Sequence, residues 1–325
     1  AQESRGLGDV YKRQVLVMLT VALIAFSMFR YVGDPIASMV GQDTTPEQRV
    51  QLREQLGLND PFVVQYAHFV ANAVRGDFGI SYRHRRPVSE LLEERMPATL
   101  ELSFVSAVMA LALGIPMGIY TALKRHGVLS KAFMAISLAG ISLPTFLIGI
   151  LLILFFGVQL RWLPSFGRGD VVGLGWWTTG FLTKSGLLAL IMPAITLALF
   201  QMTLIMRLVR AEMLEVLRAD FIKFARARGL PERLINFRHA LKNTMVPVIT
   251  ITGLQLGSII AFAIITETVF QWPGMGLLFI QAISMVDIPV MAAYLVLIAF
   301  MFVVINLVVD LLYFAVDPRL RVQSK

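Results

Sequence analysis

The sequence lacks cysteine and contains few residues suited to catalysis. No cysteine occurs among its 325 residues, which excludes disulfides and thiolate metal sites. The four histidines are scattered without an HExxH pattern, so neither a metal centre nor a hydrolase triad is supported. They are His68, His84, His126 and His239. We therefore expect no catalytic, cofactor-binding or metal-binding residues on this chain.

Charge is also scarce. Charged residues make up 15% of the chain and hydrophobic residues 57%, whereas a soluble domain carries about a quarter charged residues. Five stretches contain no Asp, Glu, Lys or Arg, and each reaches the roughly 20 residues that a helix needs to cross a membrane. They are Leu102 to Leu123, Ala132 to Leu160, Ser185 to Met206, Asn243 to Thr266 and Ile288 to Val309. An intramembrane enzyme would need clustered catalytic residues in these spans, and they contain none.

A sixth apolar segment, Val15 to Phe29, lies near the start of the sequence. It is short, but Arg30 can extend it by placing its guanidinium at the membrane interface. A signal peptide is the alternative, because Lys12 and Arg13 precede the apolar run. No small-x-small cleavage site follows closely, so we favour a membrane anchor. The preceding residues, Ala1 to Gln14, lack an initiator Met, and we expect a truncated or non-native start.

The distribution of basic residues predicts the orientation of these six helices. With both termini in the cytoplasm, 18 of the 29 Lys and Arg residues lie on the cytoplasmic side, as the positive-inside rule requires. The same rule explains the net charge of +8, so we infer no nucleic-acid partner. The predicted fold is an all-α integral membrane protein with six transmembrane helices, located in the cell inner membrane.

The stretch from Asp34 to Glu101 is polar and has helical patterning of its own. One helix is predicted to begin at Thr45 and Pro46 and to end at Gly57, and a second to cover Pro61 to Val74. We interpret residues 15–101 as the first transmembrane helix with a small extracytoplasmic region that offers a docking surface. Residues 102–325 then form a five-helix core.

The longest cytoplasmic segment lies within residues 207–247. From Arg207 to Ala227 the residues favour a helix without interruption, with Phe221 and Phe224 on its apolar face. Gly229 is suited to end that helix, and Pro231 to begin another, with Phe237 on the apolar face. The pattern predicts two short amphipathic helices joined by a turn, suited to fit a groove on a partner protein.

Several motifs here resemble one family. The run ADFIKFARARGLPERLINFRHALKNTMVP, from Ala219 to Pro247, is similar to the coupling loop of ATP-binding-cassette (ABC) importer permeases of the dipeptide, oligopeptide and nickel class. Three further runs resemble the same class: SLPTFLIGILLILFFGVQLRWLPSFG, TETVFQWPGMGLLFIQAISMVDIPV and NLVVDLLYFAVDPRLR. The resemblance implies that ten residues contact an ATPase subunit: Ala219, Asp220, Ala225, Arg226, Ala227, Gly229, Arg238, His239, Ala240 and Pro247.

The chain departs from the general importer motif, which has a Glu six residues before the Gly and then two Ala. Lys223, Phe224 and Ala225 occupy these positions here, and Pro247 lies further downstream than the general motif places it. Because the peptide class tolerates both changes, the departures favour the peptide class over other importer permeases.

The resemblance implies a transporter made of separate parts. A second, homologous permease, giving a heterodimer, would complete the pathway. Two ATPase subunits would bind ATP and Mg²⁺, and an extracytoplasmic solute-binding protein would deliver di- or oligopeptides. The sequence contains no GxxxxGK[ST] phosphate loop, so ATP hydrolysis is expected on the partner subunits. Import of nickel complexes or another small solute is an alternative. A secondary transporter is another, although no internal repeat supports it.

We make separate predictions for four further residues, of which only Gly229 lies in the 207–247 segment. Glu267 and Asp287 bracket an outer loop, where they could contact the binding protein or simply be solvated. Gly253 opens a GxxxG pattern that allows close helix packing. A Gly229→Asp substitution is predicted to abolish transport, because a side chain would clash at the turn and prevent a left-handed cap.

Overall fold

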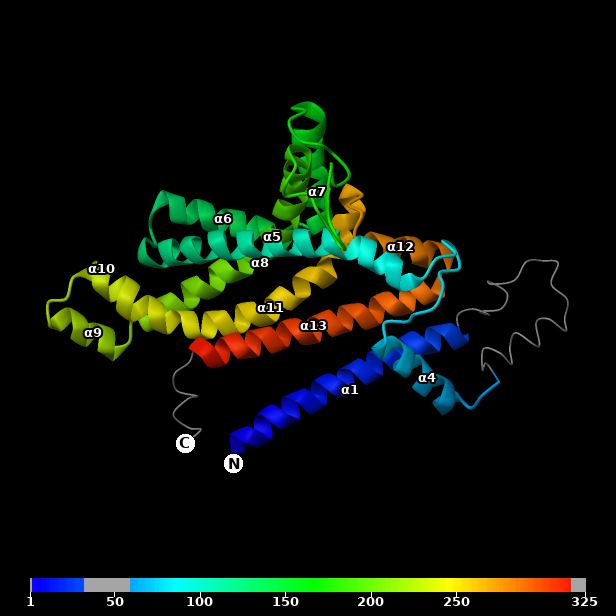
Figure 1. Cartoon of the computed structure of the whole chain (residues 1–325). Helices are drawn as coiled ribbons and strands as arrows, with labels where there is room; N and C mark the ends of the chain where they lie inside the picture. The colour runs from blue at the N-terminus through cyan, green and yellow to red at the C-terminus, as the bar shows by residue number, and fades with distance from the viewer. Residues whose placement is uncertain (1, 32–58, 317–325) are drawn as a thin grey trace. The chain divides into compact units, whose positions relative to one another are not determined.

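The computed structural model describes residues 2–31 and 59–316 (Figure 1). The predicted helix at Thr45 to Gly57 lies outside the described residues. The elements in chain order are α1 (Gln2–Tyr31), α4 (Phe62–Val74), α5 (Val88–Leu123), α6 (Val128–Ser142), α7 (Thr145–Leu152), the π-helix η1 (Ile153–Gln159), β1 (Val172–Leu174), β2 (Trp177–Thr179), α8 (Lys184–Val216), α9 (Asp220–Ala227), α10 (Glu232–Leu234), the π-helix η2 (Ile235–Ala240), α11 (Leu241–Phe270), α12 (Met275–Met285) and α13 (Ile288–Val316).

Among the described residues, three helices are long and apolar enough to cross a membrane, and two bent pairs bring the number to as many as five. The three are α5, α8 and the part of α13 up to Val309. Shorter apolar helices cover Gln14–Phe29, Phe62–Val74 and Met275–Met285. The predicted helix over Pro61 to Val74 is confirmed as α4. The expectation of an all-α chain omits one feature, the small sheet of β1 and β2 in the loop between η1 and α8.

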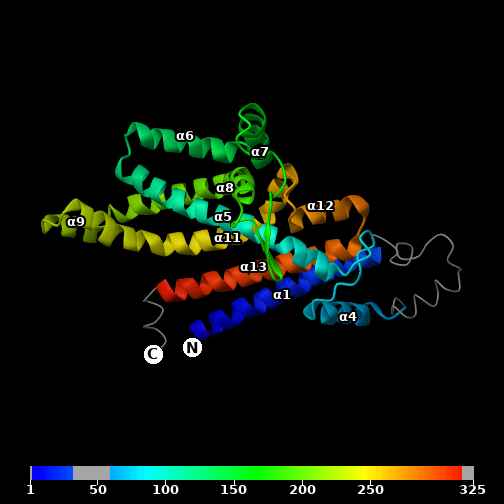
Figure 2. The same cartoon turned by 45° about the horizontal axis from the view of Figure 1, so that its top comes forward.

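The segment predicted to cross as one span between Ala132 and Leu160 is sharply bent. The chain bends by 111° between α6 and the helix that α7 and η1 form together. Figures 1 and 2 show this change of direction between α6 and α7. The break follows from Pro144, because a proline disfavours helical backbone at the preceding residue. Leu143 accordingly has an extended conformation, with φ −93° and ψ 135°.

The chain forms two compact units. One consists of Ala1–Pro97, Gly175–Trp177 and Pro273–Val303. Its core joins the start of α5 to α12 and α13, and the rings of Phe279 and Tyr294 stack there at 4.3 Å. In this unit α4 lies beside α1, so the described part of the predicted extracytoplasmic region packs on the first apolar helix.

The second unit consists of Ala98–Leu174, Thr178–Trp272 and Val304–Lys325. Its core is built by α5, α8 and α11. Glycines allow these helices to approach closely: a Cβ at Gly118 would lie within 3 Å of Val209 and Met206 on α8. A Cβ at Gly253 would overlap Val309 of α13, so the close packing predicted for the first glycine of the GxxxG pattern is confirmed.

Candidate functional site

The segment over residues 207–247 contains an interruption that the sequence did not predict. Helix α8 ends at Val216, and Ala219 is extended before α9 begins at Asp220. The expectation of one helix from Arg207 to Ala227 is therefore wrong. The break redirects the chain so that Ile222 of α9 becomes fully buried, and this burial outweighs the helical preference of the residues between the two helices.

The predicted turn after α9 is confirmed. Gly229 has a φ of +76°, the left-handed conformation that glycine adopts most readily. The amide of Leu230 donates to the carbonyl of Ala225, and Pro231 directly precedes α10. However, a Cβ at Gly229 would meet no atom within 4 Å. The predicted clash is wrong, and only the left-handed backbone restricts substitution.

The second predicted helix does not stand alone. The three residues of α10 continue into η2 and then directly into α11. Pro247 consequently lies inside α11 rather than in the loop. A movement at the turn would therefore act on the end of a long apolar helix without an intervening flexible joint.

The inward face of this segment is packed against two other helices. A buried cluster joins Ile222 and Ala225 of α9 and Ile235 of η2 to Ala122 of α5 and Met213 of α8. Ala240 belongs to the same cluster, and the hydroxyl of Thr244 donates to Met213 Sδ at 3.4 Å. The segment is thus packed on the ends of α5 and α8 and continues directly into α11.

The outward face is different from the one predicted. Phe221, Phe224 and Phe237 were expected to form the packed apolar faces, but their side chains are 46%, 64% and 53% exposed. Smaller residues form the buried face instead. Three large aromatic rings held at a surface by a packed support indicate an interaction site, because burying such rings contributes strongly to association.

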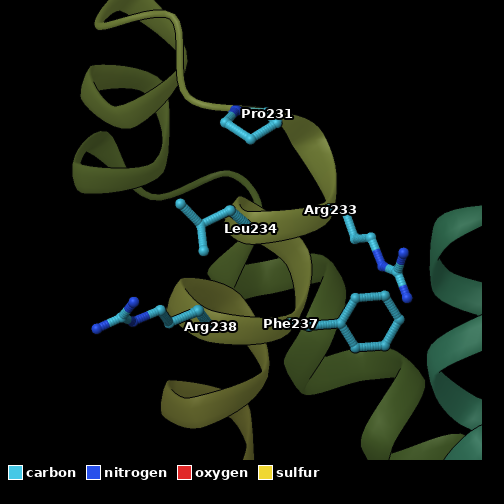
Figure 3. A pocket seen from close by; sticks show the side chains of 5 residues that line it. All are labelled: Pro231, Arg233, Leu234, Phe237 and Arg238. Atoms are coloured by element: carbon cyan, nitrogen blue, oxygen red, sulfur yellow. The ribbon is translucent and has the colours of Figure 1, made fainter.

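A hollow of about 610 Å³ lies beside α10 and η2, after the turn (Figure 3). Its lining residues are Pro231, Arg233, Leu234, Phe237 and Arg238. Figure 3 shows Arg233 and Phe237 projecting on one side of the ribbon and Leu234 and Arg238 on the other. The combination of apolar groups and guanidinium groups suits a partner that presents both apolar and acidic side chains.

The remaining polar residues stabilise the segment itself. Arg226 forms a salt bridge with Glu232 at 2.8 Å, across the Gly229 turn. Lys223 donates to Asp220 at 2.8 Å, and this hydrogen bond and positive charge hold the pKa of the Asp220 carboxyl below its ordinary value. Ala219 directly precedes α9, and Ala227 is the last residue of that helix. The carbonyl of His239 accepts a hydrogen bond from the side-chain amide of Asn243.

Glu267 and Asp287 do not lie on an exposed surface. Glu267 is 0% exposed and accepts a hydrogen bond from Thr99 at 2.6 Å. Asp287 is 2% exposed and accepts from the Ser81 hydroxyl and from the backbone amide of Tyr82. We expected these two carboxylates either to be solvated in a loop or to contact a binding protein directly. Both expectations require an exposed carboxylate, and the observed burial contradicts them.

A buried ion pair between α5 and the loop that precedes α8 was missed. Arg168 Nη2 lies 2.5 Å from Glu101 Oε2, and the two side chains are only 6% and 3% exposed. Arg168 also donates to the hydroxyl and carbonyl oxygens of Thr178. The only sequence signal is one arginine in a loop that also contains Asp170, and charged residues in loops are common at solvated surfaces.

Comparison with known proteins gives a consistent result. Residues 114–322 match the family model described as "Binding-protein-dependent transport system inner membrane component", and residues 10–103 match the model of its N-terminal region. The chain is 35% identical to a dipeptide transport system permease protein of Alkalihalophilus pseudofirmus, covering 94% of this chain and 96% of the relative. It is 36% identical to a glutathione transport system permease protein of Escherichia coli, covering 97% and 99%.

The fold also has a counterpart among solved structures. An inward-facing form of the MetNI methionine ABC transporter aligns with a TM-score of 0.55, covering 70% of this chain and 96% of that chain at 21% identity. At this identity the likeness concerns the fold alone.

Proposed function

Since the chain belongs to the family of binding-protein-dependent transport system inner membrane components, we propose that it is the permease subunit of an ABC importer for di- and oligopeptides. The relatives named for dipeptide and glutathione transport support this substrate class, because their similarity extends over almost the whole chain. A permease of this family is a transport subunit and not an enzyme.

The proposed topology has six spans with both termini in the cytoplasm. The spans are α1, α5, the bent segment from α6 to η1, α8, α11 and α13. The distribution of Lys and Arg supports this orientation, because it places the basic segment around Gly229 on the cytoplasmic side. In the assembled transporter, a second permease completes the pathway, a binding protein delivers the peptide, and two ATPase subunits hold ATP and Mg²⁺.

The observation that carries the proposal is the two-sided structure of the segment around Gly229. Its exposed side chains include three aromatic rings, and two arginines line the hollow after the turn. Its inward face is buried against Ala122 of α5 and Met213 of α8. A close-packed contact transmits displacement because it cannot be compressed. An ATPase subunit that seats on the outward face would therefore move the ends of the transmembrane helices as it closes around ATP.

Phe237 provides a direct test of this docking surface. Its ring is about half exposed, and full burial of a phenylalanine contributes about 1.5–3 kcal/mol. Covering the exposed half should therefore contribute about 0.8–1.5 kcal/mol, which corresponds to a roughly four- to thirteenfold change in affinity. We expect Phe237→Ala to weaken ATPase binding by this factor in a pull-down titration of the solubilised complex.

Phe262 is a matched control. It has the same exposure of 53% but lies within α11, so Phe262→Ala should leave ATPase binding unchanged. Equal ATPase binding by the wild-type, Phe237→Ala and Phe262→Ala proteins would contradict the assignment of the docking surface.

A further inference from the structure

Helix α4 has three chemically distinct faces. Its sequence, FVVQYAHFVANAV, contains no Asp, Glu, Lys or Arg. At 100° per residue, Phe62, Tyr66 and Phe69 share one face. A second face, roughly twice as wide, carries only valine and alanine: Val63, Val64, Ala67, Val70, Ala71 and Val74. A narrow polar stripe of Gln65, His68 and Asn72 separates the two.

The aromatic face packs on α1. Phe26 lies at the centre of the contact, with ring centroids 5.2 Å from Phe62, 5.9 Å from Tyr66 and 5.8 Å from Phe69. The Tyr66 hydroxyl donates to the carbonyl of Leu19 at 2.7 Å. Figures 1 and 2 both show α4 beside the C-terminal half of α1.

These contacts fix the level of α4 along the apolar part of α1, which covers Gln14–Phe29. At 1.5 Å per residue, Phe26 lies about 4.5 Å and Leu19 about 15 Å from the Phe29 end. A helix anchored at both positions lies beside the apolar segment rather than beyond it. Amphipathic helices that lie in a membrane interface are buried to about 5–10 Å, a depth that the two contacts with α1 bracket.

The valine and alanine face is open to the surroundings at this level. Val63 is 73% exposed, Val64 40% and Val74 82%, within the part of the chain that the structure describes. Apolar side chains of α1 between Leu19 and Phe26 are exposed as well, among them Leu23 at 39% and Ile24 at 55%. Exposed apolar side chains are therefore present on both helices at this level.

We propose that α4 is an interfacial membrane helix, with its valine face in contact with lipid acyl chains and its polar stripe directed to the headgroups. The stretch after α1 thus re-enters the membrane boundary instead of forming only a water-exposed cap. An aqueous location would leave three of the valines in water beside an apolar helix. A helix that belongs to the lipid interface is consistent with the depths of its contacts at Phe26 and Leu19, which bracket the interfacial range, and with the composition of all three faces.

The absence of native cysteine makes the proposal measurable. Single-cysteine variants Val63→Cys and Val74→Cys, with His68→Cys as the control on the same helix, would carry a nitroxide in the whole transporter reconstituted in lipid vesicles. Collision rates with oxygen, which concentrates in hydrocarbon, and with a water-soluble nickel chelate would then be compared by electron paramagnetic resonance. ATP-dependent uptake by the labelled transporter would establish that each variant is folded.

The expected result is a ratio of oxygen to nickel collisions that is several-fold higher at positions 63 and 74 than at position 68. A high nickel collision rate at all three positions would place α4 in water and overturn the proposal. Low rates for both reagents at positions 63 and 74 would show a protein partner on the valine face and would also overturn it. The outcome does not depend on which solute is transported, so it can fail while the proposed function stands.

Discussion

Replacing Arg168 by methionine would test how the loop between η1 and α8 is held to α5. The substitution keeps a long side chain but removes the charge that faces Glu101 at 2.5 Å. Glu101 would keep only a long hydrogen bond of 3.3 Å from the amide of Gly180. Both hydrogen bonds from Arg168 to Thr178 would be lost as well.

The burial of the pair sets the magnitude. With both side chains less than a tenth exposed, removal of one partner leaves a charge in a medium that solvates it poorly. Breaking a buried ion pair in this way costs about 3–5 kcal/mol, whereas removing both charges together is often nearly neutral. We therefore expect Arg168→Met to lower the free energy of unfolding by about 3–5 kcal/mol. The double variant Glu101→Gln/Arg168→Met should recover most of that loss.

The assay is a dodecyl sulfate titration of the purified permease in mixed micelles, with unfolding followed by circular dichroism. The wild type, the two single variants and the double variant form a complete cycle, which isolates the coupling between the two side chains. A loss below about 1 kcal/mol in the Arg168→Met variant would match a solvated surface pair. That result would refute the argument from burial.

Two further predictions concern a turn and an anchor. Gly229→Val should reduce ATP-driven uptake far more than Gly229→Asn, because a β-branched residue is poorly accommodated at a φ of +76° whereas asparagine tolerates it; equal uptake by the two variants would show that the left-handed turn is not required. Asp287→Asn should weaken the hydrogen bonds from Ser81, Tyr82 and Arg83 by about 1–3 kcal/mol in total, and faster tryptic cleavage after Arg83 would measure the loosened segment. Unchanged cleavage would argue against Asp287 as its anchor.

Much of the helical arrangement could be predicted from local sequence. Long charge-free runs must become helices in a membrane because the backbone has to satisfy its own hydrogen bonds there. The turn at Gly229 was predictable for a similar reason, since glycine and proline act on the nearest residues. The bend before Pro144 was also indicated by a proline. The surrounding run is apolar and free of charge, however, and was therefore predicted as one continuous span.

The faces of the site depend on contacts that are distant in the sequence. Phe224 and Ile222 both fit an amphipathic helix, and only the positions of α5 and α8 decide that the smaller side chain is buried. Glu267 meets Thr99 across 168 positions of the chain, and Asp287 meets Ser81 across 206. Sequence patterning alone could not show that these two carboxylates are buried.

The central claim, that ATP hydrolysis by partner subunits drives peptide movement through this chain, is tested most directly by uptake in reconstituted vesicles. The vesicles would contain this permease, its second permease and both ATPase subunits, with the binding protein and a radiolabelled dipeptide supplied on the extracytoplasmic side. The account predicts accumulation that requires ATP on the cytoplasmic side and is abolished by vanadate. Accumulation driven by a proton gradient without ATP would contradict it.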